Sequence, residues 1–212
     1  MIICIEGPDG CGKTTVAEVL AKRLECDVIA FPNDAAFTGP MIRAYLRKEW
    51  GCWTDGPGEH DLGFDENLSA LAFQALQVAN RMELMPRIKA AHDGGADLVL
   101  CRYWQSAWVY GQLDGLPRGF LEQIHEAMVQ PHVSILLDLD AETCLARRAK
   151  RDGPKPPERY EGDLARTRKI VELYRELWQE GGPADNWPTI DASRPFEDVL
   201  KGVFEAVDEA RS

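Results

Sequence analysis

One octapeptide near the N-terminus has residue types and a spacing that bind phosphate. Residues 7–14 read GPDGCGKT, which fits the pattern G-x-x-x-x-G-K-[S/T]. Glycines let backbone N–H groups turn toward an anion, and the N-terminus of a following helix adds partial positive charge. In such a loop the lysine reaches the β- and γ-phosphates and the hydroxyl binds Mg²⁺. The pattern indicates a nucleotide-binding P-loop.

The P-loop, residues 7–15, requires a strand before it and a helix after it, and the sequence predicts both. An apolar run at 2–5 is typical of a buried strand, and residues 13–24 have the spacing of an amphipathic helix. Lys13 and Thr14 then begin the helix, where they can contact the phosphates and the Mg²⁺ of ATP. The other expected phosphate contacts are Gly7, Gly10, Cys11, Gly12 and Thr15.

Strand and helix patterns alternate along the rest of the chain. Further strands are expected at 28–31, 96–101, 133–139 and 189–191. Further helices are expected at 40–48, 65–91 with a bend or break near Pro86, 104–113, 119–129, 142–150, 162–180 and 196–210. Strands separated by helices form parallel sheets covered on both faces. We therefore predict one α/β domain over residues 1–212, with the three-layer P-loop kinase fold, a central parallel sheet of about five strands and a small lid.

The composition argues against several classes of protein. The 212 residues include 35 Asp and Glu against 24 Lys and Arg, a net charge of −11, whereas nucleic-acid binding requires a basic surface. The six tryptophans are therefore expected in the core and the pocket. No apolar run has the length of a membrane span. The six cysteines contain no C-x-x-C pair, which favours a cytoplasmic protein with reduced thiols.

Two segments interrupt the alternation of strands and helices. Residues 51–64 are rich in Gly and Asp and are expected to form an insertion-like loop. Residues 151–157 contain one Gly and three Pro and are expected to be irregular, at the end of a basic run. Phosphoryl transfer needs arginines from separate elements and exclusion of water, so we predict a lid at about 147–160. The alternative is a solvated basic helix end. The candidate lid arginines are Arg147, Arg148, Arg151 and Arg159.

Five segments, in this order, resemble the thymidylate kinase family. They read IEGPDGCGKTT, Phe31-Pro32 followed by TGPMIRAYL, ANRMELMPRIKAAHDGGADLVLCRYWQSAWVYG, ERYEGDLARTRKIVELYREL and PTIDASRPFEDV. The resemblance covers nearly the whole chain outside the 51–64 loop. It implies a homodimer that binds small nucleotides and uses ATP and Mg²⁺ to phosphorylate a deoxynucleoside monophosphate. The acceptor would be dTMP, giving dTDP, or a related pyrimidine nucleotide.

The resemblance also implies which residues bind the acceptor. Asp9 would hold the 3′-hydroxyl of the deoxyribose, Arg81 the phosphate or the base, and Arg102 the phosphate. Ser106 and Tyr110 would line the pocket for the sugar and the base. The other expected substrate contacts are Phe31, Pro32, Arg43, Phe73, Gln77 and Tyr160.

A further implication of the resemblance concerns the arginine that assists transfer. Gly10 stands where some family members carry an arginine, which is typical of the subclass whose catalytic arginine comes from the lid. Lys13, Arg102 and a lid arginine would then surround the transferred phosphoryl group. Arg151 is the first choice for that lid residue, and Arg147 is expected to contact the phosphates of ATP.

Three positions depart from the family pattern, and the first concerns the metal. Cys101 stands where the D-R-Y motif has aspartate, and a thiol is a poor ligand for a hard cation such as Mg²⁺. Either another carboxylate, Asp9 or Asp138, takes over, or Thr14 and the phosphates hold the metal alone.

The other two departures concern the acceptor. Gln77 stands one helical turn before Arg81, where the family places an aromatic residue, so it would offer hydrogen bonds to the base rather than a stacking surface. Phe73, one turn earlier, would partly substitute. Asp34 follows Phe31-Pro32 where an arginine is common, so it must point away from a bound phosphate, with Arg43 taking over.

Two other functions are consistent with these departures. Phe73-Gln74 with Arg81 also resembles the deoxynucleoside kinases, in which a glutamine reads the base and a carboxylate, here Asp34, deprotonates the 5′-hydroxyl. Against the deoxynucleoside kinase interpretation, the sequence has Cys101 where those enzymes have an acid before the arginine. That interpretation also does not explain Asp9. The third possibility is a P-loop protein that binds nucleotides without catalysis.

Overall fold

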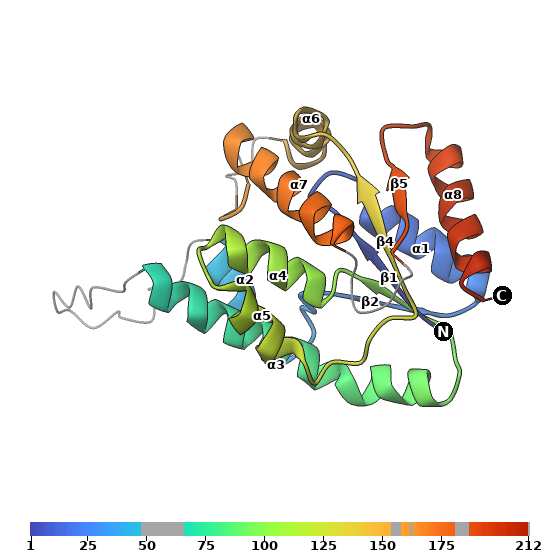
Figure 1. Cartoon of the computed structure of the whole chain (residues 1–212), viewed down its shortest axis with the longest axis horizontal. Helices are drawn as coiled ribbons and strands as arrows, with labels where there is room; N and C mark the ends of the chain where they lie inside the picture. The colour runs from blue at the N-terminus through green and yellow to red at the C-terminus, as the bar shows by residue number, and fades with distance from the viewer. Residues whose placement is uncertain (48–65, 154–157, 162, 181–186, 212) are drawn as a thin grey trace, which may run out of the picture.

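Five strands of the computed structural model form one parallel sheet in the order β2-β3-β1-β4-β5 (Figure 1). The structure describes residues 1–47, 66–153, 158–161, 163–180 and 187–211, so the expected 51–64 loop lies outside them. The strands are β1 (Ile2–Glu6), β2 (Asp27–Ala30), β3 (Leu98–Cys101), β4 (Val133–Asp138) and β5 (Thr189–Asp191). The described helices are α1 (Lys13–Leu24), α2 (Gly39–Leu46), α3 (Glu66–Asp93), α4 (Trp104–Leu113), α5 (Arg118–His125), α6 (Ala141–Asp152), α7 (Leu164–Gln179) and α8 (Phe196–Glu209).

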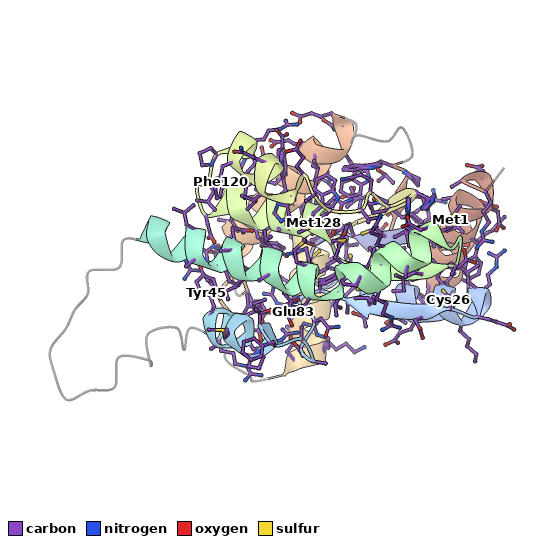
Figure 2. All side chains as sticks on the ribbon, turned by 90° about the horizontal axis from the view of Figure 1, so that it is seen from below. Met1, Cys26, Tyr45, Glu83, Phe120 and Met128 are labelled. Atoms are coloured by element: carbon purple, nitrogen blue, oxygen red, sulfur yellow. The ribbon has the colours of Figure 1, made fainter. Side chains whose placement is uncertain are left out.

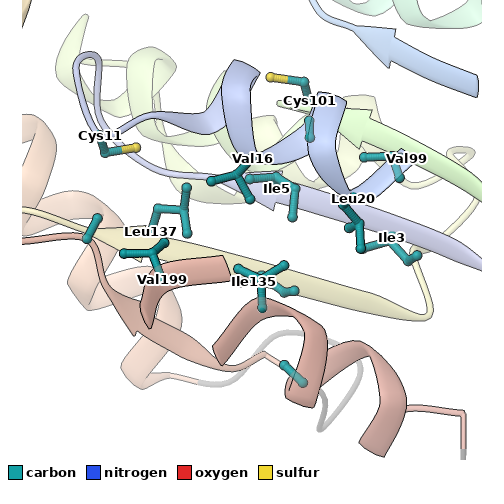
Figure 3. Close-up of a cluster of buried hydrophobic side chains, with 14 of the residues drawn as sticks. Ile3, Ile5, Cys11, Val16, Leu20, Val99, Cys101, Ile135, Leu137 and Val199 are labelled. Atoms are coloured by element: carbon teal, nitrogen blue, oxygen red, sulfur yellow. The ribbon is translucent and has the colours of Figure 1, made fainter. Parts of the chain in front are cut away.

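The central strand β1 is buried on both faces, as expected for a parallel sheet between two layers of helices. Side chains alternate across a strand, so Ile3 and Ile5 pack with Leu20 of α1 in the cluster of Figure 3. Ile2 and Cys4 point to the opposite face, in the cluster that includes the C-terminal half of α3. The sheet therefore has α1 and α8 on one side and α3, α4 and α7 on the other (Figure 1), which confirms the predicted α/β fold.

Strand register places the functional segments at one edge of the sheet. Ile5 of β1 lies opposite Cys101 of β3, and Glu6 lies opposite Leu136 of β4. The P-loop follows β1 and Arg102 follows β3, so both leave the sheet at the carboxyl ends of neighbouring strands. The Arg102 N–H donates a hydrogen bond to the Ile5 carbonyl at 3.0 Å, which joins the two exits.

Several predicted boundaries need correction. Helix α3 continues through Pro86, so the break, one of the two expected outcomes there, does not occur; the buried side chains Met85 and Ile88 hold both halves against the sheet. Helix α6 extends to Asp152 and ends at Gly153, which has a left-handed φ of 61°, so the irregular segment starts later than 151. The predicted 119–129 helix ends at His125. Where they are described, the remaining boundaries agree within about two residues.

Two broader expectations can be compared with the described part of the chain. None of its helices combines the length and the apolar composition of a membrane span. Its cysteines, Cys4, Cys11, Cys26, Cys101 and Cys144, are all free thiols.

Candidate active site

A cleft of about 1040 Å³ opens at the carboxyl edge of the sheet and gathers most of the residues chosen from the sequence. Its walls come from the P-loop, the end of β2, α2, α3, α4, α6 and the 158–161 segment. The sequence-predicted residues that line it are Asp9, Thr14, Phe31, Pro32, Arg43, Phe73, Gln77, Arg81, Arg102, Ser106, Tyr110, Arg148, Arg151 and Tyr160. These side chains come from distant parts of the sequence, and the fold brings them to one place.

The P-loop curls tightly beside this cleft. A Cβ atom on Gly7 would lie 2.6 Å from the Leu137 carbonyl oxygen, and one on Gly10 would lie 2.5 Å from the Cys144 carbonyl oxygen. Both glycines also have positive φ, so a larger residue at either position would cause both a steric clash and an unfavourable backbone conformation. The Lys13 ammonium lies inside the loop and donates to the Pro8 carbonyl oxygen at 2.6 Å.

Asp9 and Arg102 form an ion pair across the cleft, between the P-loop and the turn after β3. Lys13 Nζ lies 3.9 Å from the same Asp9 carboxylate. Burial alone would raise the pKa of Asp9, but Arg102, Lys13 and Arg151 outweigh it and hold the pKa below the ordinary value of 3.8. Asp9 is therefore an anion at neutral pH, surrounded by the cations that a phosphate would also attract.

Glu6, the last residue of β1, is a fully buried acid that sequence reasoning did not select. Its Oε1 accepts hydrogen bonds from the backbone N–H of Tyr103 at 2.6 Å and of Ser106 at 3.2 Å. Its Oε2 accepts from the Ser106 hydroxyl at 2.6 Å and the Tyr174 hydroxyl at 3.1 Å. The carboxylate thus caps the N-terminus of α4 from a neighbouring strand, where negative charge is favoured.

This cap fixes the residue that faces the P-loop. Arg102 has a left-handed φ of 64°, an uncommon conformation for a non-glycine residue. The backbone of the next residue, Tyr103, is held by Glu6. The Arg102 guanidinium lies 3.3 Å from Ser106 Oγ and 3.5 Å from the Tyr174 hydroxyl. In the sequence, the sign of this role was an acid at the end of an apolar strand. The hydrogen-bond partners of Glu6 can be identified only from the structure.

Arg81 of α3 lies deep in the cleft wall, with 2% of its surface exposed. It donates to the backbone and side-chain oxygens of Gln77 at 2.7 and 3.0 Å and to the Tyr103 carbonyl at 2.8 Å. Burial lowers the pKa of Arg81 to about 10, so the guanidinium stays charged at neutral pH. The side-chain oxygen of Gln77, which we expected to face the base, is therefore engaged by Arg81.

Comparison with known proteins places this cleft in a family. The family model described as thymidylate kinase matches residues 5–52 and 59–203. A probable thymidylate kinase of Pyrobaculum aerophilum is 32% identical over 206 residues, which cover 97% of this chain and 95% of that protein. The chain belongs to the thymidylate kinase family. The resemblance found in the sequence is thereby confirmed, and the family match omits residues 53–58, inside the predicted insertion-like loop.

Other thymidylate kinases match over similar lengths. That of Danio rerio is 26% identical over 95% of this chain and 87% of its own length. A solved structure, reported as thymidylate kinase from Candida albicans, superposes with a TM-score of 0.75 and 24% identity, covering 99% of this chain and 92% of that one. At that identity the superposition supports the fold alone, and it does so over the whole chain.

In the segment after β2, Asp34 is held where it does not face the cleft, so it would not repel a phosphate bound there. Asp34 accepts two hydrogen bonds from Arg43, at 2.6 and 3.1 Å, and is not among the described residues that line the cleft. Asn80 of α3 holds the preceding Asn33 by its backbone N–H and C=O. Glu83, labelled in Figure 2, accepts from the backbone and hydroxyl of Thr38 at 3.0 and 2.7 Å. Asp34 is thus turned toward Arg43, which does line the cleft, and is poorly placed as a catalytic base.

The lid arginines take different positions. Arg148 and Arg151 of α6 line the cleft, and each lies 3.9 Å from Glu161. Arg151 also makes two hydrogen bonds to Asp152, and its side chain is 57% exposed. Arg147 instead donates to the Ala192 carbonyl at 3.1 Å.

Arg159, the fourth candidate, belongs to the segment that covers the cleft. Its guanidinium lies 4.5 Å from the centre of the Tyr45 ring, and its backbone N–H donates to the Leu46 carbonyl at 2.7 Å. The next residue, Tyr160, donates its hydroxyl proton to Asp114 at 2.5 Å. Within the predicted lid, residues 159 and 160 therefore contact α2 and Asp114, the residue after α4, and Arg151 as the catalytic choice stays a prediction.

Asp138, one of the two carboxylates considered for the metal, has a structural partner, and Cys101 stands where the family has aspartate. Asp138 accepts hydrogen bonds from Arg175 at 2.9 to 3.2 Å and is not among the described residues lining the cleft. Cys101 lines the cleft, but burial raises the pKa of its thiol despite the nearby Lys13 and Arg102. The thiol is therefore protonated at neutral pH and unsuited to Mg²⁺.

We predict that the Glu6 cap is a large contribution to stability. Glu6→Ala leaves two buried N–H groups without a partner and should lower the free energy of unfolding by about 3 kcal/mol or more. Glu6→Gln should lose less than half as much, because its amide oxygen still accepts from Tyr103 and its NH₂ can donate to the Ser106 and Tyr174 oxygens. Urea unfolding measures both, with exposed Glu18→Ala as control. Equal losses in the two Glu6 variants would contradict the cap.

A second prediction concerns pH. Because the folded-state pKa of Asp9 is lowered, its ionised carboxylate stabilises the fold above the ordinary pKa of 3.8, and this stabilisation is lost as pH falls below it. The stability difference between the wild type and Asp9→Asn should be constant from about pH 7 to pH 5 and should shrink below about pH 4. Denaturation at several pH values measures it. Because Arg102 contributes most among the cations that lower this pKa, the acid-range change should become smaller in an Arg102→Met background, and an unchanged acid-range change there would reject that cause.

Proposed function

We propose that this protein transfers the γ-phosphoryl group of ATP to dTMP, giving ADP and dTDP. The observation that carries the proposal is one cleft that joins the P-loop to arginines from three other elements. Arg81 comes from α3, Arg102 from the turn after β3, and Arg148 and Arg151 from α6. Membership of the thymidylate kinase family supports dTMP as the acceptor.

The charges suit transfer between two anions. ATP and a nucleoside monophosphate repel each other, so their phosphates must be brought together by cations held in place before binding. The acceptor oxygen already belongs to an anionic phosphate near neutral pH, and no strong general base is needed. This agrees with the position of Asp34, which would be the base of a deoxynucleoside kinase and is instead paired with Arg43.

Mg²⁺ fits this site only in partnership with the phosphates. Within the described residues, no group of three or more His, Cys, Asp or Glu side chains could hold a metal. Asp9 is paired with Arg102 and Asp138 with Arg175, which leaves the Thr14 hydroxyl among the three candidate ligands chosen from the sequence. When bound, the ion would neutralise charge on the β- and γ-phosphates.

The residues of the chain divide the remaining tasks. Lys13 and the P-loop amides bind the donor phosphates, Arg102 binds the acceptor phosphate, and a lid arginine, with Arg151 as the choice, approaches the γ-phosphoryl group. In this structure Arg102 is paired with Asp9, and Arg151 with Asp152. These carboxylates hold the guanidinium groups near the positions where phosphates would bind.

The direct test is ADP release with ATP, Mg²⁺ and each deoxynucleoside or its monophosphate. We expect turnover with dTMP and none with thymidine. Turnover with thymidine alone would show a deoxynucleoside kinase, and ATP binding without turnover on any acceptor would show a non-catalytic protein. Lys13→Ala should lower kcat by roughly a hundredfold or more, because it removes a cation from the transferred group. Lys22→Ala, on the same helix α1 but outside the P-loop, is the control.

We also propose that the enzyme acts as a cytoplasmic homodimer, as its family resemblance implies. Analytical ultracentrifugation provides the test of assembly. Sedimentation at twice the 23.7 kDa of one chain is the expected result, and a single 23.7 kDa species at assay concentration would contradict it.

A further inference from the structure

Gln74 of α3 is a buried glutamine whose amide is unsatisfied. Only 1% of its surface is exposed, and neither its Oε1 nor its Nε2 has a hydrogen-bond partner within the described part of the chain. The side chain nevertheless lines the cleft. Leaving a buried donor or acceptor unpaired costs about 1–3 kcal/mol, so an apolar residue would suit the empty fold better.

The surroundings of Gln74 hold the amide in place without bonding to it. Helix α4 passes close by at Gly111, where a Cβ atom would lie 3.1 Å from Gln74 Nε2. The preceding Phe73 is stacked on Tyr45 with ring centres 3.9 Å apart, which fixes this turn of α3. A Cβ atom at 111 would meet Leu121 first, at 2.5 Å, and would then press on the Gln74 amide, so glycine at this position lets the two helices approach closely.

The neighbouring amide is already engaged. Gln77, one turn further along α3, accepts a hydrogen bond from Arg81 at its side-chain oxygen, which occupies one of the two acceptor positions of that oxygen. Among the described residues that line the cleft, Gln74 is the glutamine with neither its amide oxygen nor its amide nitrogen engaged. It offers one donor and one acceptor side by side, in a plane.

That pair matches the edge of a thymine or uracil base. Their N3–H donates, and the adjacent carbonyl oxygen accepts, so the amide oxygen and NH₂ can meet both in two parallel hydrogen bonds. We propose that Gln74 binds the N3–H edge of the acceptor's base and thereby sets the preference of this cleft for such pyrimidines. The inference rests on the proposed function, and it identifies a specificity-determining residue of that reaction.

The test combines a variant with a modified substrate. Gln74→Leu keeps the side-chain size and removes both hydrogen bonds, and the 3-methyl derivative of dTMP removes the donor at N3. We expect Gln74→Leu to lower kcat/KM for dTMP roughly 5- to 100-fold, the effect of one to two neutral hydrogen bonds. The value for 3-methyl-dTMP should change less than about threefold, so the variant loses most of the wild-type discrimination between the two.

A stability measurement separates recognition from a structural role. Removing an unsatisfied amide should leave the melting temperature of Gln74→Leu equal to or above that of the wild type. Gln112→Leu is the matched control. Its amide nitrogen is also buried without a partner in the described chain, but it belongs to no described wall of the cleft. This control should keep the wild-type discrimination between the two substrates.

The experiment distinguishes a failure of the Gln74 inference from a failure of the proposed function. If the wild type does not phosphorylate dTMP, the proposed function fails, and the inference that rests on it fails too. If the wild type is active but Gln74→Leu discriminates as well as the wild type does, the inference alone is overturned. A fall in activity on both substrates together with a lower melting temperature would also overturn it, because Gln74 would then act through the fold.

Discussion

The buried carboxylate of Glu6 is the interaction on which the site depends. It receives hydrogen bonds from the start of α4 and from Tyr174 of α7, directly beneath the P-loop. A buried anion is stable only when its acceptor sites are satisfied, so these elements must keep their relative positions. Arg102 takes its left-handed conformation between Glu6 and the cleft, and Asp9 pairs with Arg102 in turn. The end of β1 thus fixes the positions of both Arg102 and Asp9.

The electrostatics reconcile an acidic protein with anionic substrates. The chain carries a net charge of −11, yet arginines converge on the cleft from α2, α3, the turn after β3 and α6. Several of these cations are paired with acids, as in Arg43 with Asp34 and Arg151 with Asp152. Such pairs limit repulsion among the arginines, and substrate phosphates can compete for the same guanidinium groups.

Local patterns predicted much of the architecture. The P-loop is a continuous motif and the elements follow short periodicities, so the sequence alone indicates the fold and the phosphate site. Partners from distant segments could not be predicted in this way. The ion pair with Arg175, on α7, gives the candidate metal ligand Asp138 a structural partner, and no spacing in the sequence predicts this pair. Gln77 and Gln74 each resemble a base-binding position of a different kinase family, and the structure distinguishes them by the contact of Gln77 with Arg81.

The central claim is that one cleft holds the donor and acceptor phosphates together. An analogue in which adenosine and thymidine are joined through a chain of phosphates tests it most directly by titration calorimetry. The account predicts one analogue bound per chain, more tightly than ATP or dTMP alone, and exclusion of both nucleotides by that analogue. Two analogues bound per chain, or continued binding of dTMP to the saturated protein, would contradict the account.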